Sequence, residues 1–219
     1  MKTVAVVPIK LNSVRLPNKN IKAFDNGKPL CWYIFQTLKT VKGIDEVYVY
    51  CSNPEIKKYI PDGVKYIERS INLDQNSTKI NEVLYAFAND IIADVYVMTH
   101  TTAPFIKPDS IEKGLNAVLG GVYDSSFAAK ELQDFLWKDN EPFNYSLNDI
   151  PRTQDLPVLM EETSGFYIYK RDIIMNMNRR IGEKPYIVTI GEIESIDIDE
   201  QENFDIANAV FNFFYKDKS

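Results

Sequence analysis

The chain has 219 residues, of which 45% are apolar and 12% aromatic, and its formal net charge is −6. This length suits one sizeable core and is too short for a second full domain, so we expect a single domain over residues 1–219. The acidity argues against a general nucleic-acid binder, and no stretch reaches the ~18 apolar residues of a membrane span. A short N-terminal apolar run, unlike a signal peptide, and two cysteines without metal-ligand spacing indicate buried thiols in a cytoplasmic protein.

The stretch from Val4 to Lys22 predicts a buried strand followed by a basic loop. Residues 4–7 are all apolar, and Pro8 is expected to end the strand because it cannot supply a ladder hydrogen bond. The loop has no acidic residue and no glycine, and its side chains include Lys10, Asn12, Ser13, Arg15, Lys19, Asn20 and Lys22. Ligands of open α/β sheets bind outside the carboxyl ends of the strands, so this loop is a candidate polyanion site. A solvated basic surface loop is the alternative.

Strand and helix patterns alternate over the first half of the chain. Apolar residues at helical spacing predict helices over about 29–41, about 80–91 and from Pro108, and short apolar runs predict strands at 47–51, 64–67 and 95–98. This alternation predicts an α/β fold with a mostly parallel, Rossmann-like sheet flanked by helices and joined by right-handed crossovers.

The pattern changes after Gly121. Residues 123–130 have the character of a strand, and residues 135–142 have that of a hairpin. The segment 134–157 contains Phe135, Trp137, Phe143 and Tyr145 with little helical order. Two interpretations remain open, an ordinary surface excursion with its aromatics folded back and a projecting interface.

Two aspartates further along the chain form a candidate cation site. Asp197 and Asp199 alternate with isoleucines, so in a strand both carboxylates point to one side. Adjacent carboxylates repel each other unless a cation or proton lies between them, but the same alternation is typical of a half-exposed edge strand. The spacing alone leaves both interpretations open.

The single histidine, His100, follows the strand predicted at 95–98 and excludes a multi-histidine metal site. A lone histidine is more often structural than catalytic. Its position at a strand end also suits a side chain that hydrogen-bonds a substrate carboxylate or phosphate, or orients a hydroxyl.

Three segments, in order, resemble the acylneuraminate cytidylyltransferases and their KDO-activating relatives, which are nucleotidyltransferases of the glycosyltransferase-A type. The first segment comprises residues 7–10, Ser13, residues 17–22 (PNKNIK) and residues 27–30 (GKPL). The second comprises residues 152–157 (RTQDLP) and 162–169 (ETSGFYIY), and the third is 194–199 (ESIDID) with the helix that follows. Together these matches extend from Val4 to about Ala209.

The resemblance implies transfer of CMP from CTP to a sugar acid or related surface-polysaccharide precursor, with release of pyrophosphate and Mg²⁺ as cofactor. It implies catalytic roles for Lys19, Asp197 and Asp199, with the two aspartates holding the metal. The implied nucleotide-binding residues are Lys10, Asn12, Ser13, Arg15, Lys19, Arg69 and Thr78. The implied acceptor-binding residues are Asn20, His100, Thr102, Arg152, Gln154 and Glu162. In this family the region of residues 134–157 projects and makes the dimer contact, so a homodimer is expected.

Several positions depart from the family pattern. Lys10 stands where the family usually has arginine, His100 where it usually has glutamine, and Thr163-Ser164 where it often has asparagine. Residues 11–15 (LNSVR) replace the family's Gly-Gly-Ser-Lys-Gly element. These departures leave the acceptor open. The alternatives are the same chemistry with a phosphorylated polyol or other small phosphorylated acceptor, and a catalytically silent nucleotide-binding protein.

Overall fold

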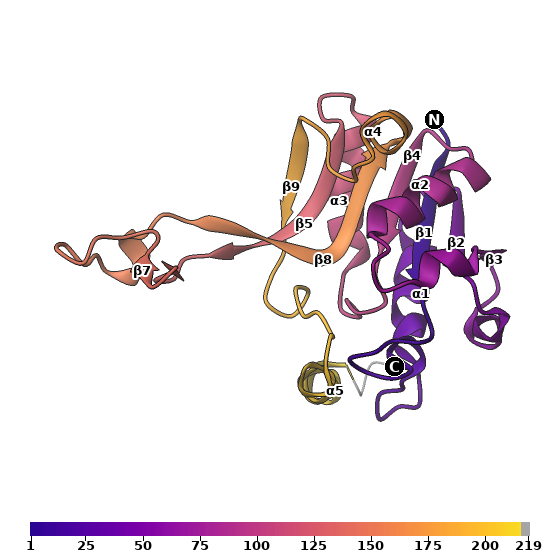
Figure 1. The fold of residues 1–219 in the computed structure, drawn as a ribbon, viewed down its shortest axis with the longest axis horizontal. Coiled ribbons are helices and arrows are strands. Elements are labelled where there is room, and N and C mark those ends of the chain that lie inside the picture. Colours follow the sequence, from indigo (N-terminus) through magenta and orange to yellow (C-terminus); the bar gives the residue numbers. More distant parts are fainter. Residues whose placement is uncertain (216–219) are drawn as a thin grey trace.

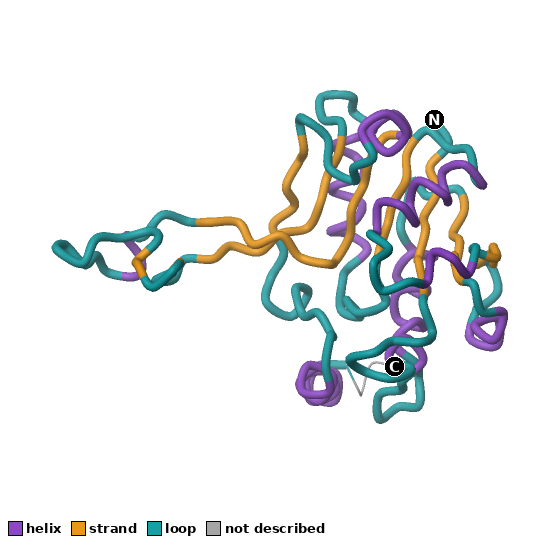
Figure 2. The backbone as a smooth tube through the Cα atoms, in the orientation of Figure 1, coloured by secondary structure: helices purple, strands orange, loops and turns teal. Residues whose placement is uncertain are grey.

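The computed structural model describes residues 1–215. Within them, the core is a seven-stranded sheet in the order β3-β2-β1-β4-β8-β5-β9 (Figures 1 and 2). Its strands are β1 Thr3–Ile9, β2 Glu46–Cys51, β3 Val64–Glu68, β4 Val95–Thr99, β5 Ser125–Leu132, β8 Leu159–Lys170 and β9 Pro185–Thr189. The ladders on both sides of β8 are antiparallel and the other ladders of this sheet are parallel. The predicted mostly parallel α/β fold is confirmed.

Strand β1 lies inside the sheet between β2 and β4. Residues 4–7 are fully buried and pack alternately into the two core layers, as a strand covered on both faces requires. The expectation that Pro8 ends the strand is wrong, because β1 continues to Ile9. Pairing with β4 stops at Val6 opposite Met98, so one side of β1 is free at Pro8. A proline is tolerated where a strand has such a free side.

Helices cover both faces of the sheet. They are α1 Leu30–Thr40, α2 Ile80–Asp90, α3 Pro108–Leu119, α4 Arg171–Met177 and α5 Gln201–Phe214. Buried residues of α1 and α3 share one core cluster, and those of α2 and α4 share the cluster on the other face. The 3₁₀ turns are η1 Lys19–Ile21, η2 Pro54–Tyr59, η3 Ile71–Asp74 and η4 Thr153–Asp155. Within residues 1–215, no helix has the length and apolar character needed to cross a membrane.

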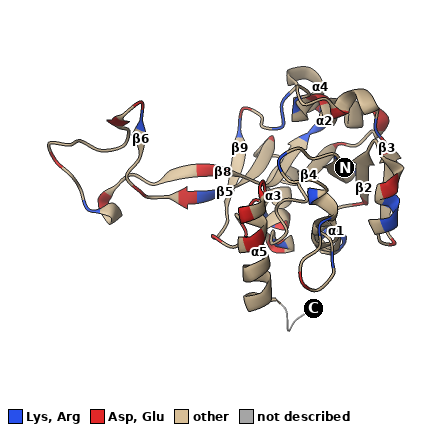
Figure 3. Cartoon of the chain, turned by 60° about the horizontal axis from the view of Figure 1, so that its bottom comes forward, with Lys and Arg blue, Asp and Glu red and all other residues tan. Residues whose placement is uncertain are grey.

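Helix α5 packs beside the loop that follows β1. The two segments lie side by side at the lower end of the sheet in Figure 1, and Asn208 in α5 hydrogen-bonds Asp25 in the loop. Phe24 from the loop packs against Phe204 and Phe211 of α5 in a third core cluster. In Figure 3 the red of acidic residues appears toward the start of α5, and the rest of the helix is tan, the colour of uncharged residues. The uncharged remainder of the helix, which packs its phenylalanines and bonds its asparagines to the loop, therefore brings the segment before it close to the basic loop.

A two-stranded arm projects from the sheet (Figures 1 and 2). β5 and β8 continue into it, and its far part holds the short strands β6 Trp137–Lys138 and β7 Glu141–Pro142. Trp137 and Phe143 are 56% and 58% exposed. The projecting hairpin is as predicted, and its aromatics do not all fold back onto the domain.

Candidate active site

A polar cavity of about 360 Å³ lies at the carboxyl end of the sheet. The loop after β1, the end of β4 and the segment before α5 contribute to its wall. Most of the predicted site residues line it, namely Lys10, Ser13, Arg15, Lys19, Asn20, His100, Thr102, Asp197 and Asp199. The fold thus brings the basic loop and the acidic pair to the same place.

Asp199 is held by two cations of the loop. Arg15 donates two hydrogen bonds to its carboxylate, at 2.8 and 2.9 Å, and Lys19 donates a third at 3.0 Å. Burial works against ionisation of Asp199, but Lys19 and Arg15 outweigh it and hold the pKa of this carboxyl below its usual value. The carboxylate is therefore ionised at neutral pH, and its charge is offset within the chain.

Asp197 is bound differently. Its Oδ2 accepts a hydrogen bond of 2.9 Å from the Ser164 hydroxyl of β8, whereas its Oδ1 is buried with no hydrogen-bond partner. The expected strand around it is absent, because residues 196–199 form no ladder. The alternation nevertheless holds. Ile198 is fully buried and its N–H bonds the carbonyl of Thr102, while both aspartates line the cavity.

The two carboxylates suit a magnesium ion bound together with a substrate. Within residues 1–215, no three His, Cys, Asp or Glu side chains are grouped so that they could enclose a metal ion. Mg²⁺ is usually held by one or two carboxylates plus phosphates and waters, so it does not need such a cage. The orphaned Oδ1 of Asp197 fits a ligand oxygen of this kind. Both oxygens of Asp199 are bonded to Arg15, and one also to Lys19.

The side chain of Asn20 links the basic loop to the end of β4 by hydrogen bonds. Its amide nitrogen donates to the carbonyl of Lys10 at 2.6 Å, and its amide oxygen accepts from the Thr101 hydroxyl. Asn20 is buried, and Asn18 just before it takes a left-handed backbone conformation, with φ of 57°. These contacts fix a loop that contains no glycine. The contact with an acceptor predicted for Asn20 stays a prediction.

His100 lines the cavity as a neutral imidazole. Burial is the main cause that lowers the pKa of His100 to about 4, and the positive charge of Arg180 adds to it. The negative charge of Asp197 raises the pKa of His100, but by less than burial and Arg180 lower it. At neutral pH one ring nitrogen of His100 can therefore donate a hydrogen bond and the other can accept one.

The predicted nucleotide-binding residues fall into two groups. Lys10 donates to Asn76 at 3.1 Å, and both line an adjoining cavity of about 360 Å³ together with Asn12. Arg69 is instead 4% exposed and pairs with Asp74, and Thr78 is half-buried before α2. Neither Arg69 nor Thr78 lines these two cavities.

The predicted acceptor residues of the second family segment lie away from the cavity. Arg152 is on the arm and pairs with Asp155 at 2.7 Å. Gln154 is on the arm too, where its carbonyl accepts a bond from Gln133. Glu162, at the base of the arm, contacts Tyr167 and Arg180. One protomer therefore does not bring Arg152 and Gln154 to the cavity.

Three residues at the cavity were not among the predicted site residues, namely Pro8, Thr101 and Ser164. Ser164 bonds Asp197, and Thr101 bonds Asn20. Thr101 lies beside His100, so the strand-end position could have indicated it. The contact of Ser164 with Asp197 joins residues 33 positions apart, and no local spacing signals it.

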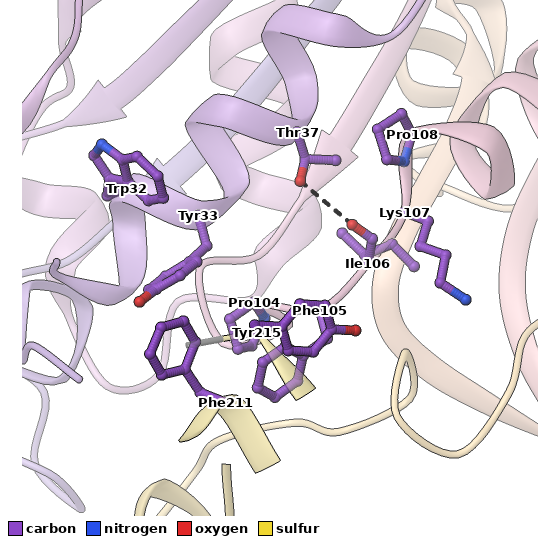
Figure 4. A pocket seen from close by; sticks show the side chains of 10 residues that line it. All are labelled: Trp32, Tyr33, Thr37, Pro104, Phe105, Ile106, Lys107, Pro108, Phe211 and Tyr215. Atoms are coloured by element: carbon purple, nitrogen blue, oxygen red, sulfur yellow. Dashed lines mark hydrogen bonds between the residues drawn. The ribbon is translucent and has the colours of Figure 1, made fainter. Parts of the chain in front are cut away.

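A second hollow, of about 330 Å³, is apolar (Figure 4). It lies between α1, the segment 104–108 and α5, and the rings of Phe105 and Tyr215 stack in it at 5.4 Å. The cation on its rim, Lys107, pairs with Glu194 at 3.2 Å. Phosphate recognition needs cations and polar donors, so the polar cavity is the candidate active site.

Comparison with known proteins identifies the family of this chain. The model of the cytidylyltransferase family matches residues 4–217. N-acylneuraminate cytidylyltransferase A of Danio rerio is 26% identical over 98% of this chain and 52% of the relative. 3-Deoxy-manno-octulosonate cytidylyltransferase of Escherichia coli is 24% identical over 81% of this chain and 76% of the relative. The chain thus spans about half the length of the first relative.

Solved structures share the fold. CMP:2-keto-3-deoxy-manno-octonic acid synthetase complexed with CTP matches 97% of this chain and 99% of its own, with a TM-score of 0.76 and 20% identity. The 4-diphosphocytidyl-2C-methyl-D-erythritol synthase of Anaerococcus prevotii DSM 20548 matches 96% of both chains, with a TM-score of 0.69 and 16% identity. At these identities the likeness establishes the fold. With the family model matched over residues 4–217, the chain belongs to the cytidylyltransferase family.

Proposed function

We propose that this chain transfers CMP from CTP to a small acceptor and releases pyrophosphate. The observation that carries the proposal is the arrangement in the polar cavity. Two loop cations, Arg15 and Lys19, bind Asp199, and the neighbouring Asp197 has one carboxylate oxygen without a hydrogen-bond partner. In the reaction, an acceptor oxygen bonds to the α-phosphorus while the bond from that phosphorus to the bridging oxygen breaks, and pyrophosphate leaves.

Each group has a distinct task in this proposal. Arg15, with its planar fork of donors, and Lys19 bind phosphate oxygens and offset their charge. Asp197 and Asp199 hold a divalent cation, Mg²⁺ in our proposal. The bound cation supplies positive charge at the α-phosphate, where negative charge develops in the transition state. His100 and Thr102, which line the cavity after β4, are the residues that we propose hydrogen-bond the acceptor.

The acceptor we favour is a sugar acid, because the relatives named above are cytidylyltransferases of N-acylneuraminate and 3-deoxy-manno-octulosonate. A phosphorylated polyol is a second candidate, favoured by the fold shared with the diphosphocytidyl-methylerythritol synthase. We further propose a homodimer joined through the arm, whose exposed aromatics suit an interface. In it, Arg152 and Gln154 would complete the partner's acceptor site. The two free, buried thiols suit a cytoplasmic location for this chemistry.

Two measurements on the purified chain test the proposal. Thermal shift with Mg²⁺ and each of CTP, UTP, ATP and GTP should show the largest stabilisation with CTP. Pyrophosphate release should then require CTP and one acceptor from a panel of N-acetylneuraminate, 3-deoxy-manno-octulosonate and a phosphorylated polyol. Equal stabilisation by all four nucleotides contradicts the proposal. CTP binding without turnover on any acceptor points to a silent nucleotide-binding protein.

A further inference from the structure

The pairing of β5 with β8 is interrupted beside the active site. Phe127 pairs with Tyr167, but the next paired residues are Ala129 and Glu162. The β8 residues 163–166 therefore lie opposite Ala128 alone. Such a bulge bends a strand and re-aims its side chains. Figure 1 shows β8 turning here from the arm into the sheet.

The backbone of this bulge is fixed on both sides of Ser164. The Thr163 hydroxyl donates to the carbonyl of Ala128 at 3.0 Å. At Gly165, an added Cβ would lie 2.9 Å from Cδ1 of Ile106 and 3.3 Å from Cβ of Ala128. A side chain at this position would require the Ile106 side chain to shift and would press on Ala128, so glycine gives the closest packing here. Ser164 thus lies between a residue that is hydrogen-bonded to β5 and a glycine that is closely packed.

Ser164 hydrogen-bonds Asp197, the carboxylate of the pair that still has an oxygen without a hydrogen-bond partner. Both oxygens of Asp199 are bonded to Arg15, and one also to Lys19. Asp197 instead receives the Ser164 hydroxyl at Oδ2, 2.9 Å away, and its buried Oδ1 has no partner. A hydroxyl fixes the orientation of a carboxylate without neutralising its charge. The attraction of Asp197 for a cation is therefore retained.

We propose that Ser164 is a positioning residue, whose hydroxyl orients Asp197 so that Oδ1 is held ready as a ligand for a divalent cation. This inference rests on the proposed function. Partners of metal ligands commonly act in this way, and their loss typically costs about 10- to 100-fold in metal affinity or activity.

The test measures Mn²⁺ binding by electron paramagnetic resonance, with the α,β-methylene analogue of CTP at one fixed concentration. Chelation by the analogue is the same in every sample, so differences report the protein. Ser164→Ala is expected to weaken Mn²⁺ binding about tenfold. Ser164→Thr keeps the hydroxyl and should bind nearly as well as the wild type, whereas Ser164→Val, with the same shape, should match Ser164→Ala. Analogue binding should change little.

Ser195→Ala is the matched control. Ser195 is half-buried, lies outside the lining of the active-site cavity and donates to the carbonyl of Glu192 at 2.9 Å, so its loss should leave Mn²⁺ binding unchanged. Mn²⁺ binding by Ser164→Ala equal to the wild type, with Asp197→Asn impaired, overturns the positioning role alone. Equal losses in Ser164→Thr and Ser164→Val also overturn it. Absence of protein-dependent Mn²⁺ binding in the wild type overturns both this inference and the metal site of the proposed function.

Discussion

Arg15 and Asp199, 184 positions apart, are joined by two hydrogen bonds of 2.8 and 2.9 Å. The pair ties the loop after β1 to the segment before α5. The same guanidinium fork fits a phosphate as well as it fits a carboxylate. Lys19 completes the arrangement at 3.0 Å from Asp199. A bound triphosphate would therefore compete with Asp199 for cations that are already in place.

Lys19→Met should weaken CTP binding at least about tenfold, because a hydrogen bond to a charged group contributes about 1.5–3 kcal/mol and about 1.4 kcal/mol is a factor of ten. Lys22→Met is the matched control. Lys22 belongs to the same loop but bonds Gln201 and lies 4.4 Å from the Phe204 ring centre. Calorimetric titration with CTP at low and high salt measures both variants, and the loss for Lys19→Met should be larger at low salt. Equal losses in the two variants would show only a general effect of loop charge.

The parts of this fold that the sequence predicts are those set by local periodicity. Residues 4–7 fill both core layers, and a run of apolar residues without polar breaks is sufficient to indicate this. Asp197 and Asp199 flank the buried Ile198, so the alternation predicts correctly which side chains face the cavity. It predicts the strand wrongly, because burial alternates in any extended segment and a ladder also needs a neighbour to pair with.

Contacts that depend on the order of the strands in the sheet cannot be predicted from local sequence patterns. Ser164 reaches Asp197 only because β8 runs antiparallel between β4 and β5 and is interrupted opposite Ala128. A strand pattern specifies which face is buried, but not which strand lies next to it. The basic character of the loop is evident from the sequence, whereas its pairing with Asp199 depends on the position of α5.

The imidazole of His100 should titrate near pH 4, well below the ordinary pKa of about 6.5. The native chain then binds fewer protons than the unfolded chain between these two values. Stability should therefore fall as the pH falls from about 6.5 to about 4, and His100→Gln should reduce this loss. His100 is the only histidine, so one proton NMR signal of the metal-free chain reports it. A midpoint near 6.5 would contradict the neutral state.

Gly114→Ala should destabilise the chain by about 1–3 kcal/mol through overpacking. The new Cβ would lie 2.7 Å from Oγ of Ser126 and 3.0 Å from Cε2 of Phe166. Alanine favours a helix by about 1 kcal/mol over glycine, so a net loss means that the clash between α3 and the sheet prevails. Gly191→Ala is the control, since its Cβ would meet nothing within 4 Å. Urea unfolding compares the two, and a stabilised Gly114→Ala would refute the close packing.

The chain should be a homodimer at micromolar concentration, joined through the arm. Trp137 and Phe143 expose large aromatic surfaces there, and burying them drives association. Replacing both with glutamate should give a monomer by light scattering while CTP still raises the melting temperature. Phe213→Glu is the control, because Phe213 is 82% exposed on α5 and lies outside the arm. A monomeric wild type would remove the arm as a dimer contact.

The two aspartates should differ when each is changed to asparagine. Asp197→Asn keeps an oxygen that accepts the Ser164 hydroxyl, so the fold should be retained while a metal ligand is weakened. Asp199→Asn removes the partner of Arg15 and Lys19 instead. The folded-state pKa of Asp199 is lowered, so its ionised form stabilises the native chain at neutral pH, and this stabilisation is lost as the pH falls through that pKa. The pair is partly exposed, so the cost of Asp199→Asn should stay below about 1 kcal/mol.

Nucleotide binding separates the two variants further. With a chelator present, Asp199→Asn leaves both cations free for the triphosphate, so CTP should bind more tightly than to the wild type. Asp197→Asn releases no cation and should change metal-free CTP binding less. With Mg²⁺ present, each variant should release pyrophosphate about 100-fold more slowly or worse, as expected when a ligand of a catalytic metal is removed. Titrating Mg²⁺ against pyrophosphate release, and CTP against each variant in chelator, measures both effects. Unchanged rates and unchanged Mg²⁺ midpoints in both variants would exclude these carboxylates as metal ligands, whereas tighter CTP binding to Asp199→Asn would still establish its competition with the triphosphate.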